Sequence, residues 1–130
     1  MHRMRIAPGQ ATASLSVLAG SGEQGHVDGL QPGPDGAPLP SFSSPRGVAV
    51  QPVSGDVFVA DKGNCVIRKI VPRKGHCEVS TFVGSPGQGG STSGVGQNAR
   101  FRTPSALAFE KLTGSLVLAD AEARALWEIT

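Results

Sequence analysis

The fold is decided by one stretch of the sequence, residues 42–70, which reads FSSPRGVAVQPVSGDVFVADKGNCVIRKI. It aligns without gaps on residues 101–129, which read FRTPSALAFEKLTGSLVLADAEARALWEI, at an offset of 59. The two copies agree at 7 of 29 positions, where average composition gives about two identities by chance. The chain therefore contains an internal repeat, and stacked repeats bury a core that one copy alone cannot bury.

Short apolar runs bounded by Gly, Pro, Asp and Asn predict antiparallel strands in both copies. In the first copy the predicted strands are residues 48–50, 57–60, 65–71 and 78–83. In the second copy they are residues 107–109, 116–119 and 125–129, after which the chain ends before a fourth strand. The Gly-, Pro- and Ser-rich segments between strands predict surface loops at residues 20–41 and 84–100.

The similarity continues upstream of the first copy. Residues 15–21 resemble residues 79–85 at an offset of 64, so residues 13–19 are predicted to form an outer strand. Residues 1–12 are predicted to form a flexible N-terminal tail. The folded segment is therefore expected to span residues 13–130, with repeats at about 42–83 and 101–130.

Several motifs carry a more specific signal. They are Leu-Ala-Gly-Ser-Gly at 18–22, Asp28-Gly29, Phe42, Pro45-Arg46-Gly47-Val48-Ala49-Val50, Gly55, Val57-Phe58-Val59-Ala60-Asp61, Asn64 and Ile67-Arg68-Lys69-Ile70. Together they resemble the NHL repeat of β-propellers, and the resemblance covers about residues 15–130. The second copy departs from the pattern at Ala106, Glu122 and Ala123.

The resemblance implies an all-β fold built from propeller blades, each a four-stranded antiparallel sheet. NHL propellers usually close with about six blades. This chain supplies about two, so the resemblance implies an incomplete propeller, either a piece of a larger one or one sector of an oligomeric ring.

Length and charge exclude several classes of protein. The chain has 130 residues, which suits one modest domain and not a multi-domain enzyme with its own cofactor module. The net charge is +2, from 12 Lys and Arg against 10 Asp and Glu, so no strong field attracts nucleic acid or a membrane. No apolar run approaches the roughly 18 residues of a membrane span, and the basic start lacks the apolar core of a signal peptide. We therefore expect a cytoplasmic protein with no membrane partner.

The two cysteines, Cys65 and Cys77, are too few for a disulfide framework or a metal cluster. A turn over residues 72–75 would pair Ile70 with Cys77 and separate the two cysteines by roughly 15 Å along the hairpin. Disulfide geometry tolerates Cα separations up to about 7 Å, so both thiols are expected to stay reduced.

The sequence predicts neither catalysis nor a bound metal or cofactor. His2, His26 and His76 share no spacing that would bring metal ligands together. Asp61 and Asp120 follow equivalent strands, where a carboxylate ordinarily accepts backbone N–H groups across the turn. The alternative is metal ligation of the kind that lactonase-like and lyase propellers achieve with several blades, and two blades do not encircle a metal.

Basic residues suggest a second alternative. The cluster comprises Arg68, Lys69, Arg73, Lys74, Arg100 and Arg102. Some NHL propellers bind RNA on a basic face, and such a cluster would imitate one. Aromatic residues make up 5% of the chain with no Tyr, which gives a poor stacking surface for bases. Charges on exposed strand edges commonly solvate the edge and oppose aggregation.

The resemblance also implies where a partner would bind. The loop entering the first strand and the turn between the second and third strands meet on one face of such a blade. The candidate binding residues on that face are Arg46, Asp61, Lys62, Asn64 and Ser105. Arg46 is the sharpest candidate, because the second copy has Ser105 at its position and blade packing therefore does not require an arginine there.

The predicted function is a non-catalytic interaction module that binds a protein partner. Two alternatives remain open at this point, a fragment of a propeller hydrolase or lyase and an RNA-binding surface. Open sheet edges in a two-blade chain also predict self-association.

Overall fold

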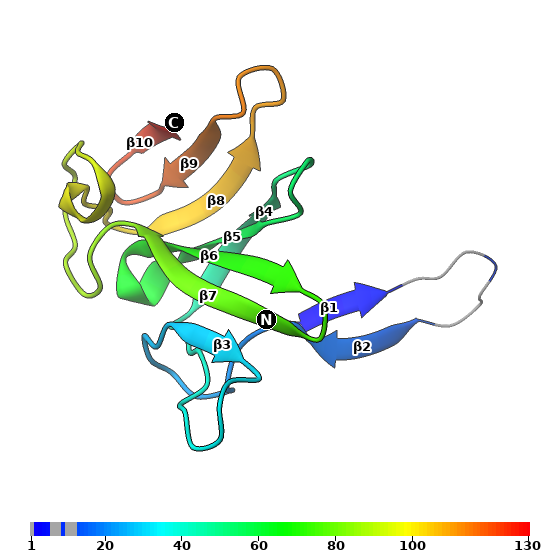
Figure 1. The fold of residues 1–130 in the computed structure, drawn as a ribbon. Helices are drawn as coiled ribbons and strands as arrows, with labels where there is room; N and C mark the ends of the chain where they lie inside the picture. Colours follow the sequence, from blue (N-terminus) through cyan, green and yellow to red (C-terminus); the bar gives the residue numbers. More distant parts are fainter. Residues whose placement is uncertain (1, 6–8, 10–12) are drawn as a thin grey trace.

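The computed structural model describes residues 2–5, 9 and 13–130, and over these residues the protein is all-β, as the sequence predicted (Figure 1). The strands are β1 (His2–Arg5), β2 (Ser14–Val17), β3 (Gly29–Gln31), β4 (Pro45–Val50), β5 (Val57–Asp61), β6 (Val66–Arg73), β7 (His76–Val83), β8 (Pro104–Phe109), β9 (Leu116–Asp120) and β10 (Ala125–Ile129). Two single turns of 3₁₀ helix are η1 (Lys62–Asn64) and η2 (Gly96–Asn98). The described strands form three antiparallel sheets.

The first blade-like sheet, here the first sheet, has the order β3-β7-β6-β5-β4. Strands β4 to β7 are the four that the first repeat predicted. Strand β3 is a correction, because it lies in the segment that was predicted to be a surface loop. It pairs with the outer edge of β7, with Gly29 opposite Val79 and Gln31 opposite Cys77. Pairing with a free strand edge orders this short segment despite its Gly-rich composition.

The predicted register of the β6–β7 hairpin is wrong by two residues. Pro72 lies opposite Cys77, and Ile70 lies opposite Val79. The reason is the turn, which is tighter than predicted and contains only two residues between the pair Arg73 and His76. Within the described part of the chain, both cysteines are free of disulfides, and Cys77 is buried.

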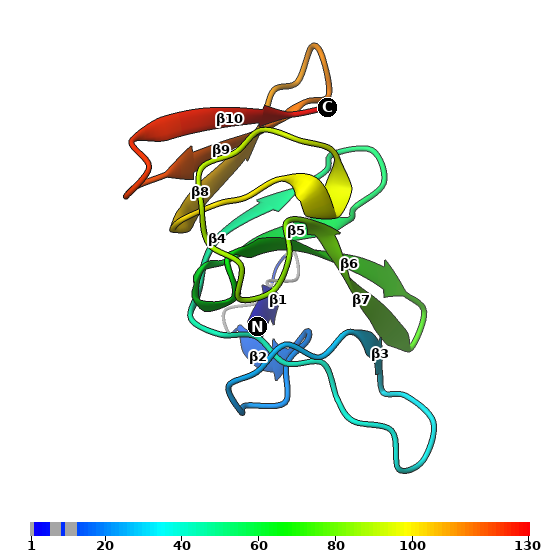
Figure 2. The same cartoon turned by 90° about the vertical axis from the view of Figure 1, so that its left-hand side faces the viewer.

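The second blade-like sheet, here the second sheet, has the order β10-β9-β8. Its three described strands are those that the second repeat predicted. The two sheets meet where β4 lies beside β8 (Figures 1 and 2). A Cβ at Gly47 of β4 would overlap the carbonyl oxygen of Ser105 and lie 2.8 Å from the Cα of Ala106. Only glycine therefore permits this approach of the two strands.

Two apolar clusters flank the first sheet. The inter-sheet cluster comprises Phe58, Ala60, Ile67, Val83, Ala99, Phe101, Leu116 and Leu118. The N-side cluster comprises Ala19, Phe42, Val57, Val59, Ile70, Cys77 and Val79. Strand β5 contributes to both because alternate side chains point to opposite faces. Both faces of the first sheet are therefore buried, whereas the second sheet buries one face against the first.

The N-terminal segment differs in part from the predicted tail. His2–Arg5 form β1, which pairs with β2, with His2 opposite Val17 and Arg5 opposite Ser14. Residues 1, 6–8 and 10–12 of the predicted tail lie outside the described residues. The hairpin of β1 and β2 lies at the end of the molecule away from β10 (Figures 1 and 2).

Candidate functional site

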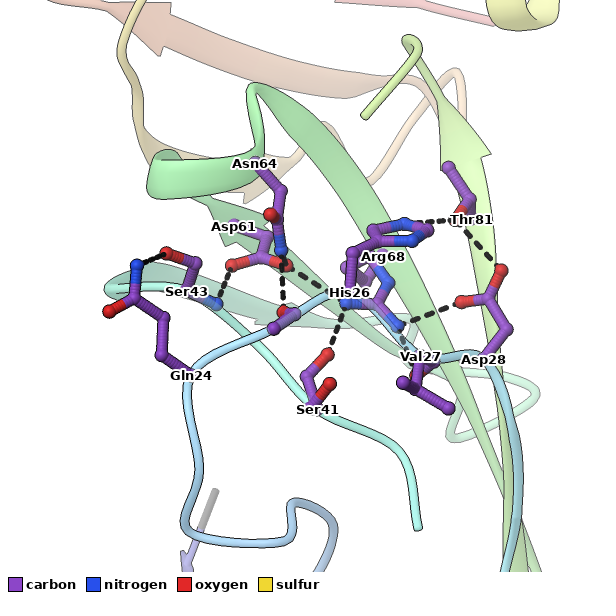
Figure 3. Close-up of polar contacts among 11 residues, drawn as sticks. Gln24, His26, Val27, Asp28, Ser41, Ser43, Asp61, Asn64, Arg68 and Thr81 are labelled. Carbon is purple, nitrogen blue, oxygen red and sulfur yellow. Dashed lines mark hydrogen bonds and ion pairs between the residues drawn. The ribbon is translucent and has the colours of Figure 1, made fainter. Parts of the chain in front are cut away.

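A buried polar network forms around Asp61, the last residue of β5 (Figure 3). Its carboxylate accepts the backbone N–H of Ser43 at 2.8 Å, Nδ2 of Asn64 at 2.7 Å and a guanidinium nitrogen of Arg68 at 2.9 Å. The 3₁₀ turn η1 reverses the chain after Asp61 and brings Asn64 back over the carboxylate. Asn64 also donates to the carbonyl of Gly25 at 2.9 Å. Asp61 therefore binds the turn and the residues just before β4, and it reaches the 20–41 segment through Asn64.

Arg68 is the second centre of this network, and it is fully buried. Besides Asp61, it binds the carbonyl of Ser41 at 2.7 Å, the carbonyl of Val27 at 2.8 Å and the carboxylate of Asp28 at 2.8 Å. Its guanidinium carbon also lies 4.8 Å from the ring centre of Phe42. A buried charge is tolerated when it is paired and hydrogen-bonded in this way. Arg68 thus fastens the 20–41 segment to β6.

The buried position of Arg68 shows that the basic surface predicted from the sequence is wrong in part. Arg68 does not contribute to it, because it shares the inward face of β6 with Val66 and Ile70. Two further members of that cluster are paired with acids, Lys69 with Asp56 at 3.6 Å and Arg73 with Glu78 at 3.4 Å. The guanidinium of Arg100 donates to the carbonyls of Gln97 and Ala99. The basic residues are therefore less available to a phosphate backbone than the sequence suggested.

A histidine, a hydroxyl and a carboxylate lie in a row at the edge of the network. Thr81 Oγ1 donates to Asp28 at 2.9 Å and lies 2.8 Å from Nε2 of His26. Because the single hydroxyl hydrogen points to Asp28, His26 acts as the donor to Thr81. The order differs from that of a catalytic triad, in which the histidine lies between the hydroxyl and the acid. The row holds the 20–41 segment against β7.

Asp120 occupies the equivalent position in the second sheet. It accepts the backbone N–H groups of Arg102 at 2.8 Å, Thr103 at 2.9 Å and Ala123 at 3.3 Å. Burial opposes its ionisation, but these N–H groups outweigh burial and hold the pKa of the carboxyl below its usual range. Trp127 replaces Arg68 here and packs against the inter-sheet cluster.

The candidate binding residues fall into two groups. Asp61 and Asn64 belong to the network, where their polar atoms bind other parts of the chain. Arg46 is exposed near the start of β4, while Lys62 in η1 is half-buried. Ser105 in β8 is half-buried and donates to the carbonyl of Thr103 at 2.7 Å. All five lie at the same end of the two sheets, because Pro45 pairs with Asp61 and Pro104 pairs with Asp120.

Neither thiol has the environment of a reactive cysteine. Burial raises the pKa of Cys65, and the carboxylates of Asp120, Asp61 and Glu122 raise it further. Burial also raises the pKa of Cys77. A nucleophilic cysteine needs the opposite shift.

Two other kinds of site are absent from the described residues. They contain no group of three or more His, Cys, Asp and Glu side chains placed to hold a metal ion. Nor does this part of the chain contain a helix long and apolar enough to cross a membrane.

The role of Arg68 and of its partners Asp28 and Ser41 was not predicted from the sequence. The sequence did contain a signal for Arg68. It lies two residues from Val66 and two from Ile70, so the period of two in a strand places it on the same face as these apolar residues. No comparable signal marked Asp28 or Ser41, which reach Arg68 only through the path of the 20–41 segment.

Comparison with known proteins shows likeness in structure alone. No protein-family model matches the chain, and no curated protein sequence matches it. A structural genomics protein of unknown function from Bacteroides thetaiotaomicron VPI-5482 is similar with a TM-score of 0.76 and 22% identity, over 96% of this chain and 28% of that one. An auxiliary nutrient binding protein from the same organism is similar with a TM-score of 0.75 and 22% identity, over 99% of this chain and 32% of that one. The chain thus spans less than a third of the length of these two structures.

Proposed function

We propose that this chain is a non-catalytic segment of an NHL-type β-propeller that binds a protein partner. The motifs of the first repeat support the family, and the two blade-like sheets support the architecture. The likeness to chains about three times as long agrees with a segment of a larger arrangement of sheets. This role requires a stable scaffold with an exposed face and no reactive centre.

The observation that carries the proposal is the shared task of Asp61 and Asp120. Both carboxylates accept backbone N–H groups from the segment that enters the first strand of their sheet. Because the two aspartates make the same backbone contacts in both repeats, their role is to stabilise the fold of each sheet. The side chains best suited to catalysis are thereby committed to holding the chain in place, which favours a binding module over a hydrolase or a lyase.

The proposed binding face is the end of the sheets that carries Arg46, Lys62 and Ser105. Arg46 is exposed, a serine (Ser105) stands at its position in the second repeat, and its neighbour Gly47 makes the close approach of β4 to β8. An exposed arginine at this position suits a protein interface, where arginine is enriched among residues that dominate affinity. The buried position of Arg68 removes part of the support for RNA binding.

The experiment compares three baits in quantitative affinity enrichment, the unaltered chain, Arg46→Ala and Lys111→Ala. Lys111 is the matched control, because it is an exposed basic residue in the turn at the opposite end of β8. We expect a protein partner whose recovery falls with Arg46→Ala and not with Lys111→Ala, while both variants keep the stability of the parent. Equal recovery by all three baits, or recovery that disappears after ribonuclease treatment, would contradict the proposal.

A further inference from the structure

Two turns of the protein carry strongly exposed aliphatic side chains. They are the turn between β4 and β5, which contains Val53, and the turn between β8 and β9, which contains Leu112. Val53 is 93% exposed and Leu112 is 96% exposed, the highest values among the large apolar side chains of the described residues. The two residues are equivalent at the repeat offset of 59. Because exposed turns ordinarily carry polar residues, glycine or proline, an aliphatic tip in both repeats requires an explanation other than packing.

Both tips are held in place by the same kinds of hydrogen bond. The side-chain oxygen of Gln51 accepts the backbone N–H groups of Val53 and Ser54. Gly55 donates its N–H to the carbonyl of Gln51 at 2.9 Å. The second turn repeats these three bonds with Glu110, Leu112, Thr113 and Gly114. The bonds fix the backbone of each turn, so docking of a partner does not have to order it.

The two turns lie side by side and form one apolar surface (Figures 1 and 2). Residues of both turns line a cavity of about 320 Å³, whose apolar walls include Pro52, Val53 and Phe109. The turn surface is defined here as Pro52, Val53, Phe109 and Leu112. A following sheet does not cover such a tip, because the second sheet packs against the first and Val53 is still 93% exposed.

Two lysines border the turn surface. Lys111 lies in the second turn itself. Lys74 lies in the turn between β6 and β7, which the antiparallel order of β4 to β7 places at the same end of the first sheet. Both lysines are exposed, and neither forms a salt bridge within the part of the chain that the structure describes. The acids of these turns are occupied, since Asp56 is in a salt bridge and Glu110 accepts N–H groups.

We propose that the turn surface docks on a membrane that contains anionic lipids. Val53 and Leu112 insert among the lipid headgroups, and Lys74 and Lys111 lie close to the negative charges there. A protein partner would have to offer a cavity for each projecting tip, whereas a lipid surface adapts to both. Binding at a membrane surface grows with the apolar area buried and with the attraction to anionic lipids, and the turn surface with its two lysines supplies both.

The sequence predicts no membrane partner, because the net charge is only +2 and no apolar run is long enough to span a bilayer. Neither quantity detects an aliphatic side chain at the tip of a turn. The turn surface lies at the end of the sheets opposite Arg46, since β4 separates Arg46 from the first turn. A membrane and the proposed protein partner therefore do not compete for one surface, and either proposal can fail without the other.

The first test is co-sedimentation of the whole chain with vesicles of phosphatidylcholine and phosphatidylserine. We expect binding that Val53→Asp and Leu112→Asp each weaken about tenfold or more, because a charge replaces an inserted apolar side chain. Val95→Asp is the matched control, since Val95 is 85% exposed in the 84–100 segment, which follows the opposite end of β7. Lack of binding by the unaltered chain, or equal weakening by the control, would overturn the proposal.

The second test concerns the two lysines. The unaltered chain should bind the mixed vesicles more tightly than vesicles of phosphatidylcholine alone. Lys74→Gln combined with Lys111→Gln should remove most of this difference, because each lysine loses its attraction to the anionic headgroups. A difference that survives the double substitution would show that another face of the molecule meets the lipid, and would overturn the proposal.

The third test locates the residues at the membrane. Ser54→Cys in a Cys65→Ser, Cys77→Ala background carries an environment-sensitive fluorophore beside an intact tip. We expect vesicles to shift its emission to shorter wavelength, and lipids with a quencher at the headgroup to reduce it. The same label introduced by Ser93→Cys, in the exposed part of the 84–100 segment, should keep its emission. An unchanged spectrum at residue 54, or an equal shift at both positions, would also overturn the proposal.

Discussion

The two sheets use an aspartate at the same position in different ways. Asp61 and Asp120 both accept backbone N–H groups from the residues before the first strand of their sheet. Asp61 also binds the side chains of Asn64 and Arg68. The second repeat has Ala123 and Trp127 at those two positions. The carboxylate of Asp120 accepts three backbone N–H groups, from Arg102, Thr103 and Ala123, and the hydroxyl of Thr103 also donates to it at 3.4 Å.

The difference between the two aspartates corresponds to a difference between the loops that precede the two repeats. The 20–41 segment is five residues longer than the 84–100 segment, and Arg68 and Asn64 tie it to the first sheet. The 84–100 segment is tied to its surroundings by backbone bonds, such as those from Gly90 to Phe101 and from Gly87 to Asn64, and the side chains of Ser85 and Arg100 bond within the segment. The backbone contacts of the aspartate are therefore the common element of the repeat, and the side-chain network is an addition that serves the longer loop.

The largest expected effect comes from breaking the network at its centre. Asp61→Ala leaves the buried Arg68 without one of its two carboxylates, and loss of one partner of a buried ion pair costs about 3–5 kcal/mol. Asp120→Ala removes acceptors from backbone N–H groups without stranding a charge, so we expect a cost of about 1–3 kcal/mol. Urea unfolding at a fixed protein concentration measures both free energies of unfolding. Equal losses for the two variants would show that Arg68 adds nothing to the role of the aspartate.

A smaller effect is expected when the network loses its cation. Arg68→Met keeps an unbranched apolar stem beside Phe42 but leaves the carbonyls of Ser41 and Val27 with one donor fewer. We expect a loss of about 2–3 kcal/mol, because each unsatisfied buried group costs about 1–3 kcal/mol. The loss is smaller than for Asp61→Ala because the buried carboxylate of Asp61, deprived of the guanidinium, keeps its donors Ser43 and Asn64, and Asp28 is partly solvated.

The part of the chain that loses protection in Arg68→Met should differ between the two loops. Backbone amide hydrogen exchange should accelerate in residues 23–31, where Arg68 holds the chain, and stay unchanged in the 84–100 segment. Uniform acceleration across both loops would contradict a local role for Arg68.

The contact between the sheets gives a third comparison. Gly47→Ala forces a Cβ against the backbone of Ser105 and Ala106. Overpacking costs about 1–3 kcal/mol, and replacing glycine in a strand recovers about 0.5–1 kcal/mol, so we expect a net loss of about 1 kcal/mol. The equivalent residue of the second repeat, Ala106, is exposed and already carries a Cβ. A gain in stability for Gly47→Ala in thermal unfolding would show that β4 and β8 can separate at little cost.

The repeat made most of this fold predictable. Seven strands of the two sheets follow from apolar runs bounded by turn residues, because each run must be buried on at least one face. Strand β3 was not predictable in this way, since Gly29, Leu30 and Gln31 are ordered by the edge of β7 and not by a pattern of their own. A weak sequence signal lies at the end of β1. Residues 5–8, Arg-Ile-Ala-Pro, resemble residues 69–72, Lys-Ile-Val-Pro, at the offset of 64 that also relates β2 to β7.

The candidate site was predictable only in part. The position of Asp61 after a strand predicted its backbone contacts, which depend on local chain reversal. Arg68 was assigned to the surface because a charged residue in a strand is ordinarily solvated. Its buried state depends on Asp28 and Ser41, which are distant in sequence and approach it through the fold of the 20–41 segment.

The smallest expected effect concerns the pH dependence of stability and Asp120. Its pKa in the folded chain is below the usual range, since N–H donors outweigh the effect of burial. Its contribution to the free energy of unfolding is therefore fully present above the unfolded pKa of about 3.9 and is lost as the pH falls through the lower folded pKa. Asp120→Asn removes this titration and keeps one oxygen to accept the N–H groups. The difference in free energy of unfolding between the parent and Asp120→Asn should therefore shrink as the pH falls from 5 toward 3, while the other carboxyl groups titrate equally in both chains and cancel. Urea unfolding across this range measures the difference, and parallel curves for the two chains would mean that Asp120 is held no more tightly as an anion than as an acid.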